Sequence, residues 1–442
     1  MKNILHKKWV WVFIIVAAIF TSLQFIRPRI INPAVTADIA ASAPVKQILR
    51  NACYDCHSNE TKLSWFDQIV PAYWLVADHI RDGRRVLNFS ESNNLTPDQQ
   101  KGIWFESLNQ MQFKVMPLQQ YVFLHPAAKI DTMEINVLKS YLSTLIHFTV
   151  SDTAKTRTWN EQYSKWIREA LIQRGVKPAL NGIAFIPEYK DWVAISSTER
   201  LDNGTLRVIM GNDMAVNAIK TNHTNPWPDG TTFAKIAWSQ VADSAGIIYA
   251  GEFKQVEFMI KDKNKYGSGD GWGFARWVKG LQLEPYGKSA LFTTECENCH
   301  RPMKENDFVF TTPFNLETEY GPQSRLINSG ADDKEGTLFT LYGNDTVAQI
   351  ARTHAVNEYS PGSALTLITW IQKEDPHWFG AQVPGVIKSV ERVRFKKTNI
   401  GTSMPVYEKY EGRPLEKVSE NRLSDVKGRL NFILNQRASV LP

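Results

Sequence analysis

An uncharged, strongly apolar segment lies near the N-terminus, at residues 9–26. As a helix, this segment would be about 27 Å long, just enough to cross the hydrocarbon core of a bilayer. Three lysines precede it, so the positive-inside rule predicts a membrane anchor within residues 1–30 and export of everything that follows. The alternative is a cleaved signal peptide, although the cleavage-like Ala-Ser-Ala at 41–43 lies well beyond the apolar run. Both interpretations predict a location on the periplasmic side of a bacterial inner membrane, either anchored or soluble.

Between residues 31 and 150 the apolar positions recur every three to four residues, which is typical of short amphipathic helices. The last helix has the clearest start, because Asp131 and Glu134 form a capping-box pattern ahead of an apolar stripe. Residues 151–182 are polar and contain one amphipathic helix, which we interpret as a strut between domains. The helices are expected at 45–51, 72–87, 98–113, 132–148 and, in the linker, 159–174.

Beyond residue 182 the pattern changes to alternation and the chain repeats itself. Eleven of the 35 residues at 204–238 are identical to those at 336–370, displaced by 132 positions. This indicates two copies of one β-rich fold, an antiparallel sheet with a helix, at 183–315 and 316–442. The fold class is therefore α+β, a small all-α domain followed by two β-rich repeats. In the first repeat we expect strands at 205–210, 232–238 and 253–260 and a helix at 214–221.

The cysteines are the part of the composition that limits the possible functions. The 442 residues are 43% hydrophobic and 22% charged, which excludes fibrous and disordered classes. A net charge of +6 without a long basic run predicts no nucleic-acid partner. All four cysteines fall in two CxxCH motifs, so none is left over for a disulfide.

In a CxxCH motif the two thiols add to the vinyl groups of haem and the histidine becomes an iron ligand. A thioredoxin-like pair would need a βαβ context and would not require the fifth residue to be histidine. A shared zinc site would need its cysteine pairs much closer in sequence. We therefore predict two covalently bound c-type haems. They are held by Cys53, Cys56 and His57 and by Cys296, Cys299 and His300.

The two haems are expected to differ in their sixth iron ligand. After the first motif, Met116 precedes a proline in a predicted loop, so its thioether is our candidate ligand. His125 is the competing candidate, and His79 is expected on a solvated helix face. After the second motif, Met303 follows His300 too closely to reach the opposite face of the haem. That iron is therefore predicted to be five-coordinate and open to a substrate.

The first domain resembles a known family. Residues 33–147, with CYDCHSNET at 53–61, the stretch at 71–92 and the segment from Met116 to Pro126, resemble the small haem-binding domain family of exported bacterial cytochromes. The resemblance implies haem c and a redox function.

The first β-rich repeat carries a second resemblance. Residues 184–312 look like the cytochrome P-460 family, through the segments at 187–192, 225–235 and 256–262, the CENCH motif and the segment at 307–311. In that family a lysine is cross-linked to the haem and a glutamate over the open iron face accepts protons. The resemblance implies these roles for Lys235 and Glu257, implies His300 as the proximal ligand, and matches Arg207 to a basic position.

The second repeat departs from this pattern. Leu367 replaces the lysine and no CxxCH follows, so we expect a degenerate structural half without haem. As a hypothesis, the two repeats form an internal pseudo-dimer. His354 and His377 are interpreted as surface or core histidines rather than iron ligands.

These expectations combine into a dihaem cytochrome that oxidises hydroxylamine or a similar small nitrogen compound at the second haem. Such a reaction needs an open iron, a base and an electron sink, and the first haem would be that sink. Glu257 can be the base if a dry pocket raises its pKa. The alternatives are a non-catalytic electron-transfer or nitric-oxide-binding cytochrome, and a peroxidase. The redox partner protein is not predicted.

Overall fold

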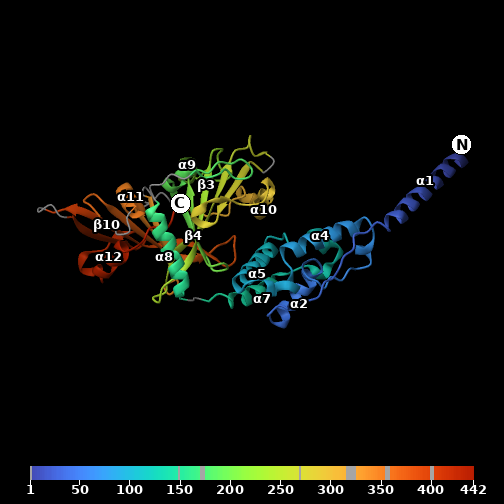
Figure 1. Cartoon of the computed structure of the whole chain (residues 1–442), viewed down its shortest axis with the longest axis horizontal. Coiled ribbons are helices and arrows are strands. Elements are labelled where there is room, and N and C mark those ends of the chain that lie inside the picture. The colour runs from blue at the N-terminus through green and yellow to red at the C-terminus, as the bar shows by residue number, and fades with distance from the viewer. Residues whose placement is uncertain are drawn as a thin grey trace. The chain divides into compact units, whose positions relative to one another are not determined.

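The computed structural model divides the chain into two compact units, residues 1–146 and 147–442 (Figure 1). The structure describes residues 2–147, 150–169, 175–267, 270–314, 325–353, 359–398 and 403–442, without the side chains of residues 2–7. His354 and the end of the predicted linker helix, residues 170–174, lie outside the described residues.

Helix α1 spans Lys2–Leu23 and ends three residues before the predicted end of the apolar segment. The side chain of Gln24 accepts a hydrogen bond from the Val70 N–H (2.9 Å) and donates one to the Val70 carbonyl (3.1 Å). The Trp74 indole N–H donates to the Ile26 carbonyl (2.6 Å). Residues 24–26 therefore pack as part of the helical unit. Among the helices that the structure describes, none is both long and apolar enough to cross a membrane, so the predicted anchor is not supported.

The first unit is helical, and the four helices predicted for it are present. The capping box is also confirmed, because Glu134 N–H donates to Asp131 (2.9 Å) and Asp131 N–H donates to Glu134 (3.0 Å). Phe105, Leu108 and Leu138 are almost completely buried. The elements are α2 (Ala43–Ala52), α3 (Tyr54–His57), η1 (Phe66–Gln68), α4 (Ala72–Val86), η2 (Phe89–Asn94), α5 (Pro97–Gln112), α6 (Gln119–Leu124), η3 (Pro126–Ala128) and α7 (Thr132–Ser143).

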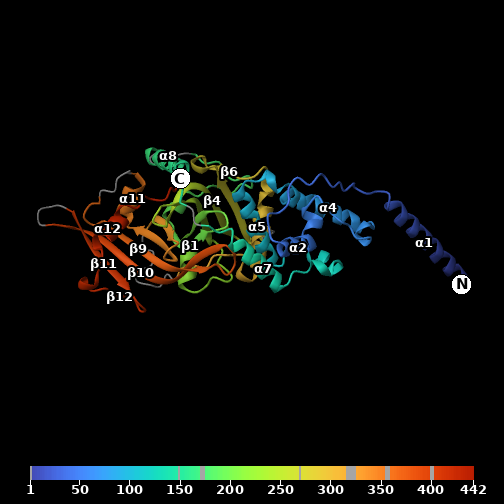
Figure 2. The ribbon, with the colours of Figure 1, turned by 90° about the horizontal axis from the view of Figure 1, so that it is seen from below.

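The second unit is built on one antiparallel sheet. Eight strands follow one another in the order β1-β2-β3-β4-β7-β8-β9-β10, and β1 pairs with β10, which closes a barrel (Figure 2). Two pairs of strands extend the sheet beyond the barrel. β5 and β6 continue it from β4, and β11 and β12 continue it from β10. The strands are β1 (Val193–Arg200), β2 (Thr205–Gly211), β3 (Thr232–Ala242), β4 (Ile247–Lys261), β5 (Trp272–Val278), β6 (Glu284–Pro285), β7 (Arg325–Asp332), β8 (Thr337–Gly343), β9 (Ala364–Glu374), β10 (Ala381–Lys397), β11 (Ser403–Glu411) and β12 (Glu416–Lys417).

The same succession of elements occurs twice around the barrel. β2 begins at Thr205 and β8 at Thr337, and β3 begins at Thr232 and β9 at Ala364, in each case 132 residues later. A helix follows the second strand of each half, and another follows its two extension strands. These helices are α9 (Asp213–Lys220) and α10 (Thr293–His300) in the first half, and α11 (Asp345–Thr353) and α12 (Val426–Leu434) in the second. Short 3-10 turns complete the unit: η4 (Pro187–Asp191), η6 (Gly280–Gln282), η7 (Ala290–Phe292), η8 (Arg301–Asn306) and η9 (Glu420–Arg422).

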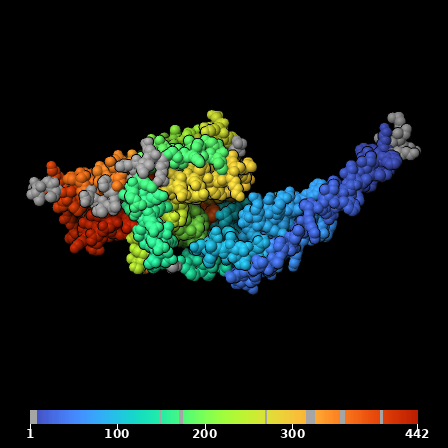
Figure 3. Space-filling model, viewed as in Figure 1, coloured from blue at the N-terminus to red at the C-terminus, as the bar shows by residue number. Residues whose placement is uncertain are grey.

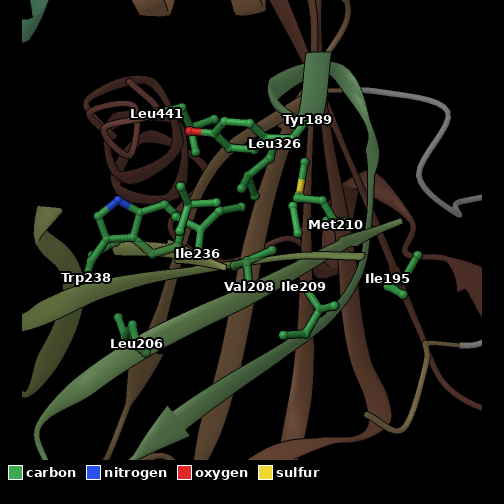
Figure 4. Packing of buried hydrophobic residues seen from close by; sticks show 14 of the residues in the cluster. Tyr189, Ile195, Leu206, Val208, Ile209, Met210, Ile236, Trp238, Leu326 and Leu441 are labelled. Carbon is green, nitrogen blue, oxygen red and sulfur yellow. The ribbon is translucent and has the colours of Figure 1, made fainter. Parts of the chain in front are cut away.

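Both halves contribute to one hydrophobic core. Figure 4 shows Leu326 and Leu441 from the second half beside Tyr189 and Ile236 from the first. The chain end is hydrogen-bonded into this core, because the Trp238 indole N–H donates to the Val440 carbonyl at 2.8 Å. The two halves therefore share one sheet and one interior.

Helix α8 (Thr153–Arg168) belongs to this second unit and lies along its outside (Figures 1 and 3). Its apolar side is buried through Tyr163 and Trp166, and the Trp166 indole N–H donates to the Leu441 carbonyl at 3.3 Å. The interpretation of this helix as a strut between domains was therefore wrong: its apolar stripe packs on the barrel unit.

Candidate functional site

The first CxxCH motif lies on the short helix α3. His57 Nδ1 is 3.1 Å from the Leu87 carbonyl, which can only accept, so the proton is on Nδ1 and Nε2 is left as a donor for a metal. Burial lowers the pKa of His57, which keeps the ring neutral at neutral pH. Burial raises the pKa of Cys53 to about 12 and that of Cys56 to about 11, so both are uncharged thiols.

Two residues of α4 that the sequence analysis did not select shape this motif. A Cβ on Gly83 would lie 2.7 Å from the Cys56 carbonyl oxygen, so only glycine allows α4 to pack this closely against α3. Arg84 donates to the Ser58 carbonyl (2.8 Å), and also to Ile31, Asn32 and Thr61. The arginine therefore ties the segment after the motif to the segment before α2.

The residues predicted as sixth ligand of a haem at this motif differ in their surroundings. Met116 lies half-buried in the loop between α5 and α6, and its role as a ligand stays a prediction. His125 has both ring nitrogens engaged, Nε2 with Asp67 (2.9 Å) and Nδ1 with the Tyr121 carbonyl (3.1 Å). His79 is half-buried and lines a small cavity together with Cys56, so its assignment to a solvated face was wrong.

The second motif ends helix α10, and its histidine is presented in the same way. His300 Nδ1 is 2.7 Å from the Phe308 carbonyl, which leaves Nε2 as the metal donor. The rings of Phe274 and Phe310 pack against the imidazole, with centroids 5.1 Å and 5.2 Å away. Burial lowers the pKa of His300 to about 4.

The Phe308 carbonyl is aimed at His300 by an unusual backbone. Asp307 and Phe308 both have positive φ (47° and 65°), a conformation that non-glycine residues rarely adopt. Lys261, which is 2% exposed, holds Asp307 in place through a 2.7 Å ion pair. Asp307 also accepts the Trp227 N–H at 2.8 Å. These contacts explain how the strained turn is maintained.

The charged residues of the predicted active site lie on one face of the sheet. Lys235 on β3 is directly opposite Glu257 on β4, which is opposite Arg276 on β5. Glu257 forms ion pairs with both, through Oε2 to Lys235 and through Oε1 to Arg276 Nε (2.9 Å). Gln255 donates to the same Oε1 (2.6 Å). Arg207 is two residues before Ile209, the β2 residue opposite Lys235, so it lies on the same face.

These groups control one another's protonation. Burial alone would raise the pKa of Glu257, but Lys235 and Arg276 outweigh it and lower the pKa to about 2. The expectation that a dry pocket raises this pKa was therefore wrong: the cationic neighbours dominate. Burial lowers the pKa of Lys235 despite Glu257, and burial together with Arg200 lowers the pKa of Arg207 to about 10.

This cluster lies beside the second CxxCH motif. Arg207 interacts electrostatically with Cys299, and Arg276 with Cys296. The sequence analysis did not select Arg276. The one feature that could have identified it is its position in an alternating segment that follows the strand of Glu257. The two cysteine thiols, a histidine that presents its Nε2 and an excess of positive charge beside them fit a covalent haem with its anionic propionates.

The corresponding place in the second half has different chemistry. Glu391 on β10 is directly opposite Leu367 on β9, in the same register as Glu257 and Lys235. Glu391 is 1% exposed and pairs with Arg429 of α12, while the Tyr407 hydroxyl donates to it at 2.5 Å. In the second half, an internal ion pair therefore occupies the position that corresponds to the one beside the CxxCH helix in the first half.

The fold and its two motifs define a haem-binding protein of the cytochrome class. Comparison with protein-family models agrees, because residues 15–144 match the haem-binding domain family and residues 186–311 match cytochrome P460. The chain therefore joins an N-terminal haem-binding domain to a cytochrome P460 domain. A comparison with curated proteins found no match.

Proposed function

We propose that this protein is a dihaem c-type cytochrome whose P460 domain oxidises hydroxylamine or a similar small nitrogen compound. The observation that carries the proposal is the Lys235–Glu257 pair, which lies on the sheet face beside the CxxCH helix α10. Cys296, Cys299 and His300 would hold the haem of this site, and bound haem supplies an iron that exchanges electrons with the substrate.

Lys235 is suited to the covalent link that the family resemblance implies. Burial lowers the pKa of Lys235, which increases the fraction of the uncharged amine, the form that can act as a nucleophile. A lysine nitrogen bonded to the macrocycle is no longer an ammonium ion. Glu257 would then lose one of its two ion-pair partners, and its pKa would rise from about 2 toward that of a useful proton acceptor.

Arg276 would then be the remaining partner of Glu257, and its 2.9 Å contact keeps the carboxylate directed along the sheet face. Proton transfer from substrate to Glu257 Oε2 would leave Oε1 hydrogen-bonded to Gln255 and in ion-pair contact with Arg276. Arg207 contributes positive charge on the same face. The electrons would pass to the first haem, held by Cys53, Cys56 and His57, with Met116 proposed as its sixth ligand.

We further propose that the second half is a copy of the P460 fold without haem, and that the two halves form an internal pseudo-dimer. The repeated element order supports this, and so does the Glu391–Arg429 pair on the face of the second half that corresponds to the proposed haem site. Light scattering after size-exclusion chromatography should then show a monomer, and a tight symmetric dimer would count against the idea.

We propose that the protein works outside the cytoplasm, because thioether attachment of haem is typical of exported cytochromes and the apolar N-terminal segment follows three lysines like an export signal. Fractionation of cells expressing the full chain tests this. Haem-loaded protein in the periplasmic fraction is expected, and recovery of the loaded protein from the cytoplasm would contradict it.

The cross-link is tested by intact mass and by the optical spectrum of the reduced protein. We expect two haems per chain, a red-shifted Soret band, and loss of that band in Lys235→Leu. Lys254→Leu, on an exposed part of β4, is the matched control and should keep the wild-type spectrum. An ordinary c-type spectrum in the wild-type protein would refute the P460 assignment at this haem.

Catalysis is tested by steady-state oxidation of hydroxylamine. Glu257→Gln should reduce kcat by about 100-fold or more if the carboxylate is the general base. Unchanged kcat would remove Glu257 from this role. The second candidate, a non-catalytic electron-transfer or nitric-oxide-binding cytochrome, is favoured by the low pKa of Glu257, because a carboxylate with a pKa of about 2 is a weak base.

A further inference from the structure

The loops that join the third and fourth strands of each half differ in length. The β3–β4 loop covers four residues, 243–246, whereas the β9–β10 loop covers six, 375–380. The two additional residues account for the change in displacement between the halves, from 132 at the start of β9 to 134 at the start of β10. The longer loop carries His377 and Trp378, and both reach the haem-binding half.

Buried contacts attach the longer loop to the start of the first half. The Gly380 carbonyl accepts the Leu201 N–H at 2.8 Å. The Trp378 indole N–H donates to Asp202 at 3.2 Å, and the Arg200 guanidinium lies 4.3 Å from the centroid of the Trp378 ring. Trp378, Arg200 and Asp202 are all less than 9% exposed, so the loop is held in a desolvated contact.

The loop also contacts the chain directly behind the proposed iron ligand. His377 Nδ1 is 2.9 Å from the Phe310 carbonyl, and His377 must be the donor because the carbonyl has no proton. The Trp378 ring meets the Phe310 ring edge-on, with centroids 6.1 Å apart. Phe310 in turn meets the His300 imidazole edge-on at 5.2 Å.

Phe310 is two residues from Phe308, whose carbonyl accepts the His300 Nδ1 proton at 2.7 Å. On one side of this short segment, Asp307 is held by Lys261 of the first half. On the other side, Phe310 is held by His377 of the second half. The acceptor of the His300 hydrogen bond therefore lies between two fixed points, one from each half of the barrel.

We propose that His377 and Trp378 are positioning residues for His300, so that the second half of the barrel completes the proximal side of the haem site. This inference rests on the proposed haem at His300, and it is independent of the reaction proposed there. A short Nδ1–H···O bond increases the electron density on the imidazole, which strengthens the iron–nitrogen bond and lowers the reduction potential.

The test uses the full-length, haem-loaded protein and resonance Raman spectroscopy of its reduced form. In His377→Phe, which keeps an aromatic ring and removes the donor, we expect the iron–histidine stretch to shift to lower frequency and broaden. The reduction potential of the second haem should rise. His377→Asn, whose amide N–H can replace Nδ1–H, should restore both values toward wild type. His147→Phe is the matched control, because His147 is exposed at the start of this unit.

Trp378→Phe is the second variant and should move both readouts in the same direction as His377→Phe. The band is assigned to the second haem by its loss in His300→Ala. If the band and the potential stay at their wild-type values in either loaded variant that folds, the proposal is wrong. If mass spectrometry of the wild-type protein shows no haem at Cys296 and Cys299, the proposed function fails instead.

Discussion

Removal of one partner of the Lys261–Asp307 ion pair should strongly destabilise the barrel unit. Lys261 is 2% exposed, and its Nζ lies 2.7 Å from Asp307 Oδ1. At that distance the attraction is about 6 kcal/mol for an effective dielectric constant of about 20, before the cost of desolvation. Lys261→Met keeps a side chain of similar length but leaves Asp307 buried without its counter-charge. Breaking a buried pair in this way typically costs about 3–5 kcal/mol.

We expect the lower part of that range, about 3 kcal/mol, because Asp307 still accepts the Trp227 N–H at 2.8 Å. Urea unfolding of the full-length protein, followed by tryptophan fluorescence, measures the free energy of unfolding. The double variant Lys261→Met/Asp307→Asn is the control and should regain part of the loss, because it removes the uncompensated charge. A loss below about 1 kcal/mol in Lys261→Met would show that the pair is not fully desolvated and would refute the estimate.

Three further changes have defined outcomes. Gly83→Ala should destabilise the helical unit by about 1–3 kcal/mol in a thermal melt and lower its haem content, because the new Cβ would lie 2.7 Å from a backbone oxygen of the first motif. Gly102→Ala is the control: Gly102 has open space around it, so this variant should be neutral or stabilising in the same melt. Burial and a nearby carboxyl raise the pKa of Glu199 from 4.5 to about 8, so the native state holds a proton that the unfolded state releases, and stability should fall as pH rises between these values. Glu199→Gln should flatten this part of a plot of urea midpoint against pH. An unchanged slope would show that Glu199 is not the group responsible. In the haem-free protein, Lys235→Leu should raise the pKa of Glu257, which infrared difference spectra would detect as a carboxylic-acid band that persists to higher pH than in the haem-free wild-type protein.

Local patterns were sufficient for the motifs, for four helices of the first unit and for three strands of the barrel. The three-to-four-residue spacing placed α2, α4, α5 and α7, and the alternation at 205–210, 232–238 and 253–260 placed β2, β3 and part of β4. These patterns depend only on neighbouring residues, which is why they can be read from a single sequence.

The closed barrel and several site residues needed information that local patterns do not contain. Pairing of β1 with β10 joins residues about 180 positions apart, and alternation does not specify register. Arg276 could not be distinguished from other strand cations until register placed it opposite Glu257. His377 was interpreted as a surface or core histidine, and its contact with Phe310 depends on the loop that crosses from the other half.

Closure of the sheet also has a consequence for any fragment of this protein. The region that matches cytochrome P460 contains β1 to β4, and in the whole chain the outer strands of this set pair with β10 and β7. Expressed alone, this region would lose the partners of Glu199 and Arg200 on β1 and of residues 247–249 on β4, whereas β5 would still pair with residues 256–261 of β4. The backbone N–H and carbonyl groups left without partners invite pairing with another chain. We expect such a fragment to associate with a second copy of itself or to aggregate, and co-expression with residues 316–442 to rescue its solubility. We therefore expect the smallest stable unit to be the entire barrel rather than the stretch that carries the haem motif.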